Sequence, residues 1–152
     1  MKTLANRNHL TEILERLSAI APSSERQWGR MTSHQMLCHL SDAFRSCLGE
    51  RAVRQSSGWI PRRPVRWVVL WFPMRWPHGV KGPPEWDPNA HGSAPKEFEI
   101  DKTELKELIE RFSSRPADFH WPEHPILGRM SQAEWLRLGY LHLDHHLRQF
   151  GS

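Results

Sequence analysis

The chain has 152 residues, a net charge of +4 and a sequence pI near 9.5. This length suits one domain, residues 1–152, and is enough to bury roughly two thirds of the unfolded surface. The 21 basic residues are interspersed with 17 acidic ones, which is typical of a solvated surface and argues against a nucleic-acid-binding protein.

The cysteines indicate a reducing compartment. Cys38 and Cys47 are expected to share one helix, whose rise separates them by roughly 13 Å. They are then too far apart to form a disulfide with each other. The sequence has no recognisable signal peptide and no apolar run near ~20 residues. We therefore expect a cytoplasmic protein without stable membrane insertion.

Helical periodicity predicts two helices in the N-terminal part of the chain. Residues 6–20 carry leucine and isoleucine at the i, i+3, i+4, i+7 spacing of one apolar helix face. Residues 32–48 open with a capping box, in which Thr32 and Gln35 each satisfy an otherwise unpaired backbone N–H. His39 lies at the border of the apolar face of this second helix.

Proline, tryptophan and glycine interrupt the helical pattern in residues 50–100. Pro64 is expected to start a short helix that ends at Phe72, because proline suits a first helical turn and Pro73 prevents continuation. We expect this basic amphipathic helix to pack over the other helices or against a second subunit. Contact with a membrane surface is the alternative.

The segment that follows, residues 73–95, is irregular and rich in proline and tryptophan. An irregular segment of this length inside a compact domain tends to be a functional lid or a binding loop. We therefore expect it to cover the mouth of the histidine site described below, with Trp76, Glu85 or Trp86 facing that site.

Two further helices are predicted in the C-terminal part. Residues 101–114 have Asp101 as the expected N-cap and Glu104 as its capping-box partner. Residues 131–149 form the most regular amphipathic helix and open with another capping box. Because strand signals are weak throughout, the predicted fold is all-α. It is an up-and-down four-helix bundle with a long Pro/Trp-rich insert between the second and third main helices.

The last predicted helix contains two candidate metal-binding histidines. His142 and His146, spaced i and i+4, lie on its apolar side, where neutral imidazoles must find partners or lose solvation free energy. With His39 they would form an open site of three imidazoles that suits Zn²⁺ and leaves a fourth position for water or substrate. Ni²⁺ and Fe²⁺ accept the same nitrogens. His145, turned roughly 100° from His146, is expected to lie outside the site. Satisfied core histidines are the alternative interpretation.

Other familiar sites are excluded by the sequence, which has no HExxH motif, Glu-x-x-His pair, P-loop, dinucleotide glycine fingerprint or CxxC. Asp42, one turn beyond His39, is a candidate to orient a ligand imidazole, and a salt bridge is its alternative role. Because metal ligands must be neutral imidazoles, occupancy is expected to fall below about pH 6, near the ordinary histidine pKa.

The motif MTSHQMLCHLSDAFR, followed after a long gap by YLHLDHHLRQFG, resembles the DinB-like (DinB/YfiT) superfamily of metal-binding four-helix bundles. The stretches WGRMTSHQ, FPMRWPHGVKGPPE and HPILGRMSQAEW resemble an uncharacterised branch of it, so the likeness spans nearly the whole chain. Carried over by this resemblance, the metal-binding histidines fall on His39, His142 and His146. The adjacent His-His pair with an arginine two residues on falls on His145, His146 and Arg148. The chain departs from the superfamily in having HHLRQ where HHRGQ is frequent, and in its long insert.

Characterised members of that superfamily include thiol-dependent S-transferases and isomerases that use bacillithiol or mycothiol, in which the metal activates a thiolate. The resemblance therefore implies a metal-dependent S-transferase or hydrolase that acts on a small molecule, with a low-molecular-weight thiol as partner. Tryptophan and phenylalanine of the insert would line an apolar pocket for the electrophile. A non-catalytic metal-binding or dimerising module, and with it a homodimer, is the alternative. Neither the catalytic residues nor the substrate follow from the sequence.

Overall fold

The computed structural model of the protein describes residues 1–55, 61–72, 75–80 and 82–152. Within these ranges the chain forms five α-helices, one 3₁₀ helix and no β-strand. In chain order the helices are α1 (Arg7–Ser18), α2 (Ser33–Cys47), α3 (Arg62–Trp71), η1 (Pro84–Trp86), α4 (Phe98–Ser113) and α5 (Gln132–Gln149). The predicted all-α class is confirmed. No helix in the described ranges has the length and apolar character needed to cross a bilayer.

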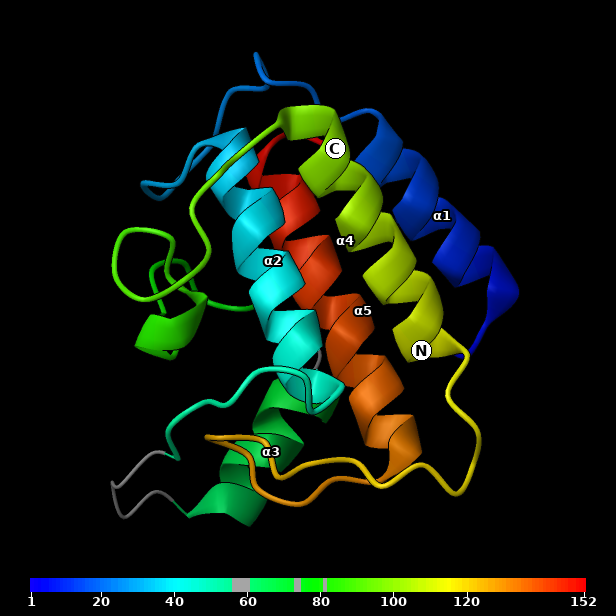
Figure 1. Ribbon diagram of the computed structural model, residues 1–152. Helices are drawn as coiled ribbons and strands as arrows, with labels where there is room; N and C mark the ends of the chain where they lie inside the picture. The colour runs from blue at the N-terminus through cyan, green and yellow to red at the C-terminus, as the bar shows by residue number, and fades with distance from the viewer. Residues whose placement is uncertain (56–60, 73–74, 81) are drawn as a thin grey trace.

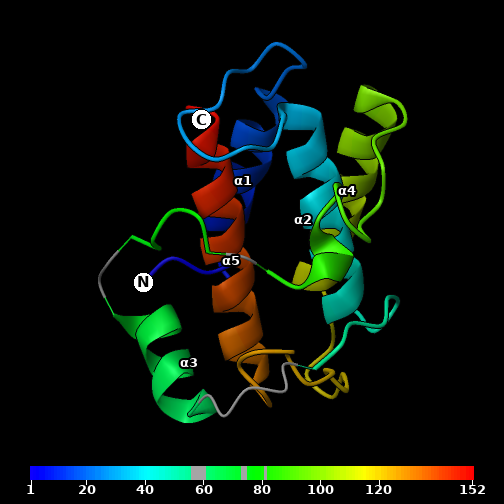
Figure 2. The same cartoon turned by 90° about the vertical axis from the view of Figure 1, so that its left-hand side faces the viewer.

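The four longer helices α1, α2, α4 and α5 lie side by side (Figure 1). α2 packs against α4 and α5, and α1 packs against the same two helices. The second and last predicted helices are therefore neighbours, as expected. The shorter α3 lies at one end of these helices, where it packs against α5 (Figure 2). η1 packs against α2 and belongs to the long segment between α3 and α4.

The caps of α2 and α5 determine the residue at which each helix begins. Thr32 Oγ1 accepts the Gln35 N–H at 3.1 Å, and Gln35 Oε1 accepts the Thr32 N–H at 3.0 Å. Ser131 and Glu134 form the same reciprocal pair at the start of α5. These two of the three predicted capping boxes are confirmed. Each box satisfies backbone donors that would otherwise be left free at a helix start.

The predicted start of the third long helix is wrong. α4 begins at Phe98, and Glu97 is its N-cap, with a carboxylate that accepts the backbone N–H groups of the next turn. Asp101 lies inside the helix, where it is buried and bonded to His34 of α2. Glu104 is paired with Arg45 of α2. The two acids satisfy the sequence pattern of a capping box, but partners on the neighbouring helix engage both side chains.

The short helix of the insert is longer at its start than predicted. α3 begins at Arg62, before the proline expected to open it, and its last residue is Trp71. Pro73, the expected terminator, lies outside the described residues. Leu70 is buried against α5, which confirms that α3 packs over the other helices. The opposite face is open, since Val68 is 45% exposed.

Gly139, inside α5, allows a close contact with the core. A Cβ at this position would lie 2.8 Å from Cε1 of Phe112 and 3.0 Å from Cδ1 of Leu4. Alanine is favoured over glycine in a helix by about 1 kcal/mol, but overpacking a rigid core typically costs about 1–3 kcal/mol. We therefore expect Gly139→Ala to lower the free energy of unfolding by about 1 kcal/mol in urea denaturation. A more stable variant would mean that helix propensity outweighs the clash.

Candidate metal centre

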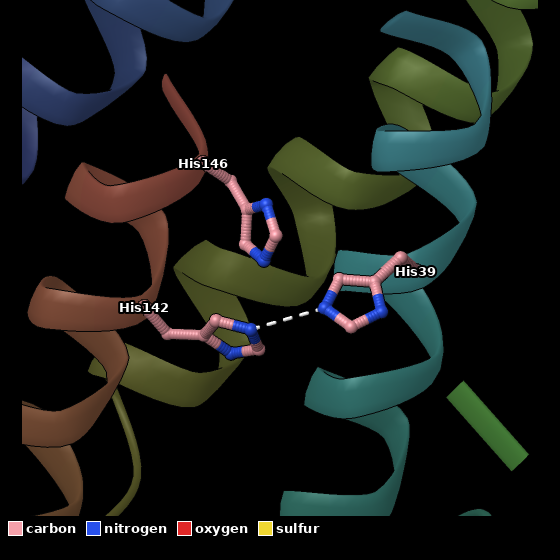
Figure 3. A group of neighbouring side chains, drawn as sticks. All are labelled: His39, His142 and His146. Carbon is pink, nitrogen blue, oxygen red and sulfur yellow. Dashed lines mark hydrogen bonds between the residues drawn. The ribbon is translucent and has the colours of Figure 1, made fainter. Parts of the chain in front are cut away.

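Three imidazoles from two helices converge between α2 and α5. His39 comes from the middle of α2, and His142 and His146 come from consecutive turns of α5 (Figure 3). Their ring centroids form a nearly equilateral triangle with sides of 4.7, 5.0 and 5.2 Å. One ligand nitrogen from each ring lies within 4.8 Å of the others. The predicted set of three histidines is therefore brought together, and His39 is buried rather than at the border of a face.

The tautomer of His39 is set by a backbone carbonyl. Its Nδ1 lies 2.9 Å from the carbonyl oxygen of Trp86. A carbonyl oxygen can only accept, so Nδ1 must carry the proton. In a neutral imidazole Nε2 then carries a lone pair, and this nitrogen is the one that faces His142. η1 thus holds His39 as a metal ligand requires.

The tautomer of His146 is set through Gln149. The Gln149 amide nitrogen donates to the carbonyl oxygen of Trp28 at 2.9 Å, which fixes the orientation of the amide. The amide oxygen therefore faces Nδ1 of His146, also at 2.9 Å, and Nδ1 must donate to it. Nε2 of His146 carries the lone pair. Two of the three rings thus present a lone pair as a consequence of their hydrogen bonds.

The third ring, His142, completes a donor set that fits a divalent cation. Its Nε2 lies 3.1 Å from Nε2 of His39, and since His39 accepts, His142 donates in this state. Two nitrogens bound to one tetrahedral Zn²⁺ at 2.0–2.1 Å would be roughly 3.3–3.4 Å apart. The observed spacing is close to that value. A cation would replace the proton that His142 shares with His39, and this proton could then move to Nδ1 of His142.

The surroundings of the three rings favour the neutral form that ligation requires. Burial lowers the pKa of His39, and burial together with the neighbouring imidazoles lowers the pKa values of His142 and His146 well below the ordinary value. Protons therefore compete less well for these nitrogens than for a free imidazole. For a metal held by these three rings we therefore expect acid-induced loss to begin at a lower pH than the value of about 6 expected from the sequence.

His145 lies outside this cluster. Its ring contacts Trp28, Trp76 and His78, with ring centroids 5.8, 6.0 and 6.2 Å away. It is not among the three histidines whose ligand atoms converge. The helical projection of α5 anticipated this, since neighbouring residues on a helix point in directions roughly 100° apart.

Asp42 does not orient a metal ligand. It is fully buried, and its carboxylate accepts hydrogen bonds from Arg45, Arg51 and Ser93. The salt-bridge alternative is the correct one, although the carboxylate is buried and its two arginines are half-buried. The groups that orient the candidate ligands are instead the Trp86 carbonyl, at His39, and Gln149, at His146. The sequence holds a signal for Gln149 only, because it lies three residues after His146 on the same helix.

The segment 73–95 contributes to the histidine site, as predicted, through two tryptophans. The ring centroids of Trp76 and Trp86 lie 6.1 and 6.2 Å from that of His142. Glu85 is engaged elsewhere, since its carboxylate accepts the backbone N–H of Arg54. Residues 73, 74 and 81 of this segment lie outside the described residues. The tryptophan part of the prediction is confirmed, whereas the Glu85 carboxylate is bonded to the backbone of Arg54 rather than to one of the three histidines.

A second group of metal-binding residue types lies between α2 and α4. His34 Nε2 lies 2.7 Å and Cys38 Sγ 3.7 Å from Oδ2 of Asp101, which also accepts the Lys96 N–H. Burial would raise the pKa of Asp101, but the bonds from Lys96 and His34 hold it below its ordinary value. Burial raises the pKa of the Cys38 thiol to about 12, so it remains a donor. His34 and Asp101 lie near positive helix N-termini, which favour the carboxylate and disfavour a cation. We interpret the group as a hydrogen-bond network that joins the two helices.

Replacing Gln149 with methionine should weaken metal binding without removing a ligand. Methionine has a similar length but cannot accept the His146 Nδ1–H, so the ring loses its fixed tautomer. Loss of such an orienting partner typically costs 10–100-fold in metal affinity, and we expect about 10-fold. A Zn²⁺ competition titration with a chromophoric chelator measures the effect, and Gln132→Met at the start of the same helix is the matched control. Equal affinities in all three proteins would refute the orienting role.

Comparison with known proteins identifies a family without supplying an activity. No curated protein and no solved structure shows a significant match to the chain. Residues 5–152 match the family described as protein of unknown function (DUF1569). The matched range includes all three converging histidines, both orienting groups and the long insert. The chain therefore belongs to the DUF1569 family.

Proposed function

We propose that the chain is a metal-dependent enzyme of the DinB-like type that acts on a small molecule, either as a thiol-dependent S-transferase or as a hydrolase. In this proposal α1, α2, α4 and α5 are the four members of an up-and-down bundle, and the segment between α2 and α4 is its insert. The mutual packing of these four helices supports this arrangement. The DinB-like motifs of α2 and α5 support the same assignment, since they supply the three converging histidines.

The arrangement of the three imidazoles is the main support for this proposal. Two imidazoles have their Nδ1 atoms engaged as donors, so their Nε2 lone pairs are directed between α2 and α5, and a third imidazole lies beside them. Three protein ligands are usual in a catalytic zinc site, and three histidines are one of the known sets, which leaves a fourth position for an exchangeable group. Zn²⁺ is the proposed ion, and Ni²⁺ or Fe²⁺ would accept the same nitrogens.

A divalent cation held by the three histidines would act as a Lewis acid that lowers the pKa of a thiol or water molecule. The residues of the chain supply the rest. Trp76 and Trp86 place two indole rings against His142, and these rings would exclude water and contact an apolar electrophile. His145 contacts Trp28 and Trp76 and lies beside His146, so it would border the substrate rather than hold the cation.

The test begins with protein loaded with Co²⁺, which reports its ligands by its absorption spectrum. We expect added bacillithiol or cysteine to produce a thiolate-to-cobalt charge-transfer band, and the Zn²⁺-loaded protein to accelerate transfer of that thiol to a bimane electrophile. His146→Ala should lose both effects. An aryl ester replaces the electrophile in the assay for hydrolysis. If no thiol alters the spectrum and neither reaction is accelerated, the enzymatic proposal fails.

A non-catalytic metal-binding or dimerising module remains the second candidate. The exposed face of α3, with Trp67, Val68 and Phe72, favours it because apolar residues gathered on one exposed face often mark an interface between subunits. In that case the metal would raise the melting temperature while the cobalt spectrum stays unchanged by thiols. Sedimentation analysis would then give a dimer that Trp67→Lys dissociates. The free cysteines support a cytoplasmic location under either candidate.

A further inference from the structure

A cavity of about 280 Å³ lies beside the metal centre but contains none of its three histidines. It is bounded by the C-terminal end of α2 with the residues that follow it, by residues 122–125, and by the start of α5. Its volume is near the lower end of the range for small-molecule pockets. Several of its walls are apolar or aromatic, and they include Cys47, Val53 and Trp86.

Trp86 belongs both to the metal centre and to the cavity. Its carbonyl oxygen holds His39, and its indole N–H donates to Ser46 Oγ at 2.9 Å, so the ring has a fixed position. The ring centroid is 6.2 Å from that of His142 and 6.0 Å from that of His124. The indole ring of Trp86 thus lies between the cavity and the three converging imidazoles.

His124 also lines the cavity, and its ring carries an N–H donor. Its Nδ1 accepts the backbone N–H groups of Ile126 at 3.1 Å and Leu127 at 3.0 Å. Burial lowers the pKa of His124 to about 4, so the ring is neutral at pH 7 and its single proton is on Nε2. Throughout the described part of the chain, no acceptor is paired with this Nε2–H.

Trp135, another residue of the cavity lining, carries a second N–H donor without a partner in the described chain. Its side chain is 1% exposed, and its indole N–H is buried without a hydrogen-bond partner in the described ranges. An unsatisfied buried donor typically costs about 1–3 kcal/mol, so a site of this kind calls for an explanation. The ring centroids of His124 and Trp135 are 5.6 Å apart. Two N–H donors without partners therefore belong to adjacent rings that line one cavity.

We propose that this cavity binds a small planar molecule whose carbonyl or carboxylate oxygen accepts a hydrogen bond from His124 Nε2–H and, as the buried indole turns toward it, from Trp135 Nε1–H. The planar part of the molecule would lie against Trp86 and Val53. Glu123, the acidic residue of the lining, is engaged by Arg129 and Arg62, which reduces its repulsion of a carboxylate. The proposal does not depend on the metal and goes beyond the proposed activity.

The experiment uses benzamide and benzoate as the carbonyl and carboxylate probes, with toluene as the probe that lacks an acceptor. The readout is the set of indole N–H resonances in ¹H–¹⁵N NMR spectra of the full chain. We expect benzamide or benzoate, but not toluene, to shift the Trp135 resonance, which the Trp135→Phe variant identifies by its disappearance. The probe that binds more tightly decides between a carbonyl and a carboxylate ligand.

Three variants separate this site from its surroundings. Trp135→Phe keeps the ring and removes the donor, and it should weaken probe binding by about 2–10-fold, the value of one neutral hydrogen bond. Val53→Trp, at a half-buried loop position, should fill the cavity and abolish binding even if Trp135→Phe fails to fold. His142→Ala should leave binding intact. An unshifted Trp135 resonance, equal binding of toluene, or full binding by Val53→Trp would overturn the proposal.

Discussion

Replacing His146 with alanine is expected to abolish stoichiometric binding of Zn²⁺ or Co²⁺, whereas His145→Ala should retain it. The side chain of His146 is held by Gln149 with its Nε2 toward His39 and His142, and removing it leaves two ligands. Structural zinc sites contribute of the order of 10 kcal/mol of binding free energy from their full ligand set, so the loss should amount to several orders of magnitude in affinity. Metal analysis of the purified variants and calorimetric titration measure it.

His145→Ala is the matched control because it removes an adjacent imidazole from the same helix. His39→Ala and His142→Ala should behave like His146→Ala. Circular dichroism of each metal-free variant establishes that the helices persist, so that loss of metal is not loss of fold. Full occupancy in His146→Ala, or loss confined to His145→Ala, would contradict the assignment of the three ligands.

Acidification of the metal-free protein from pH 7 to pH 5 is expected to lower its free energy of unfolding by several kcal/mol. The pKa values of His39, His142 and His146 are below the ordinary value of 6.5, and that of His124 is about 4. Between the folded and unfolded pKa values the unfolded chain binds more protons than the folded chain. Stability is therefore fully present above pH 6.5 and is lost as pH falls toward the folded pKa values, by about 1.4 kcal/mol per histidine per pH unit.

For His124 alone this loss reaches about 3 kcal/mol by pH 4. Urea unfolding in the presence of a chelator, at pH 7, 6 and 5, measures the total. His142→Ala should reduce the slope with pH, whatever it does to stability at pH 7. His120→Ala, at an exposed position, should leave the slope unchanged. A free energy of unfolding that is independent of pH between 7 and 5 would refute the buried neutral state of these rings.

The starts of α2 and α5 and the directions of the histidines on α5 could be predicted from the sequence, because they depend on local spacing. The capping boxes at Thr32 and Ser131 determine where α2 and α5 begin, since the two reciprocal bonds of each lie within four consecutive residues. The spacing of His142 and His146 places both rings on one side of α5 wherever that helix packs. The direction of His145 follows from the same rotation. Such features require only the helix geometry and no knowledge of the partner surfaces.

Features that depend on contacts between distant segments were decided by the tertiary structure. Asp101 has the sequence pattern of an N-cap, yet it lies inside α4 with a partly buried hydrogen bond to His34. Asp42 lies one turn from His39, but Arg51 and Ser93, from the segments after α2, engage its carboxylate. The carbonyl oxygen that orients His39 belongs to Trp86. Every residue has a backbone carbonyl, so the sequence could not show which one would bind His39. Helix starts and helix faces are local properties of this chain, whereas the partner of a buried polar group depends on which distant segment packs against it.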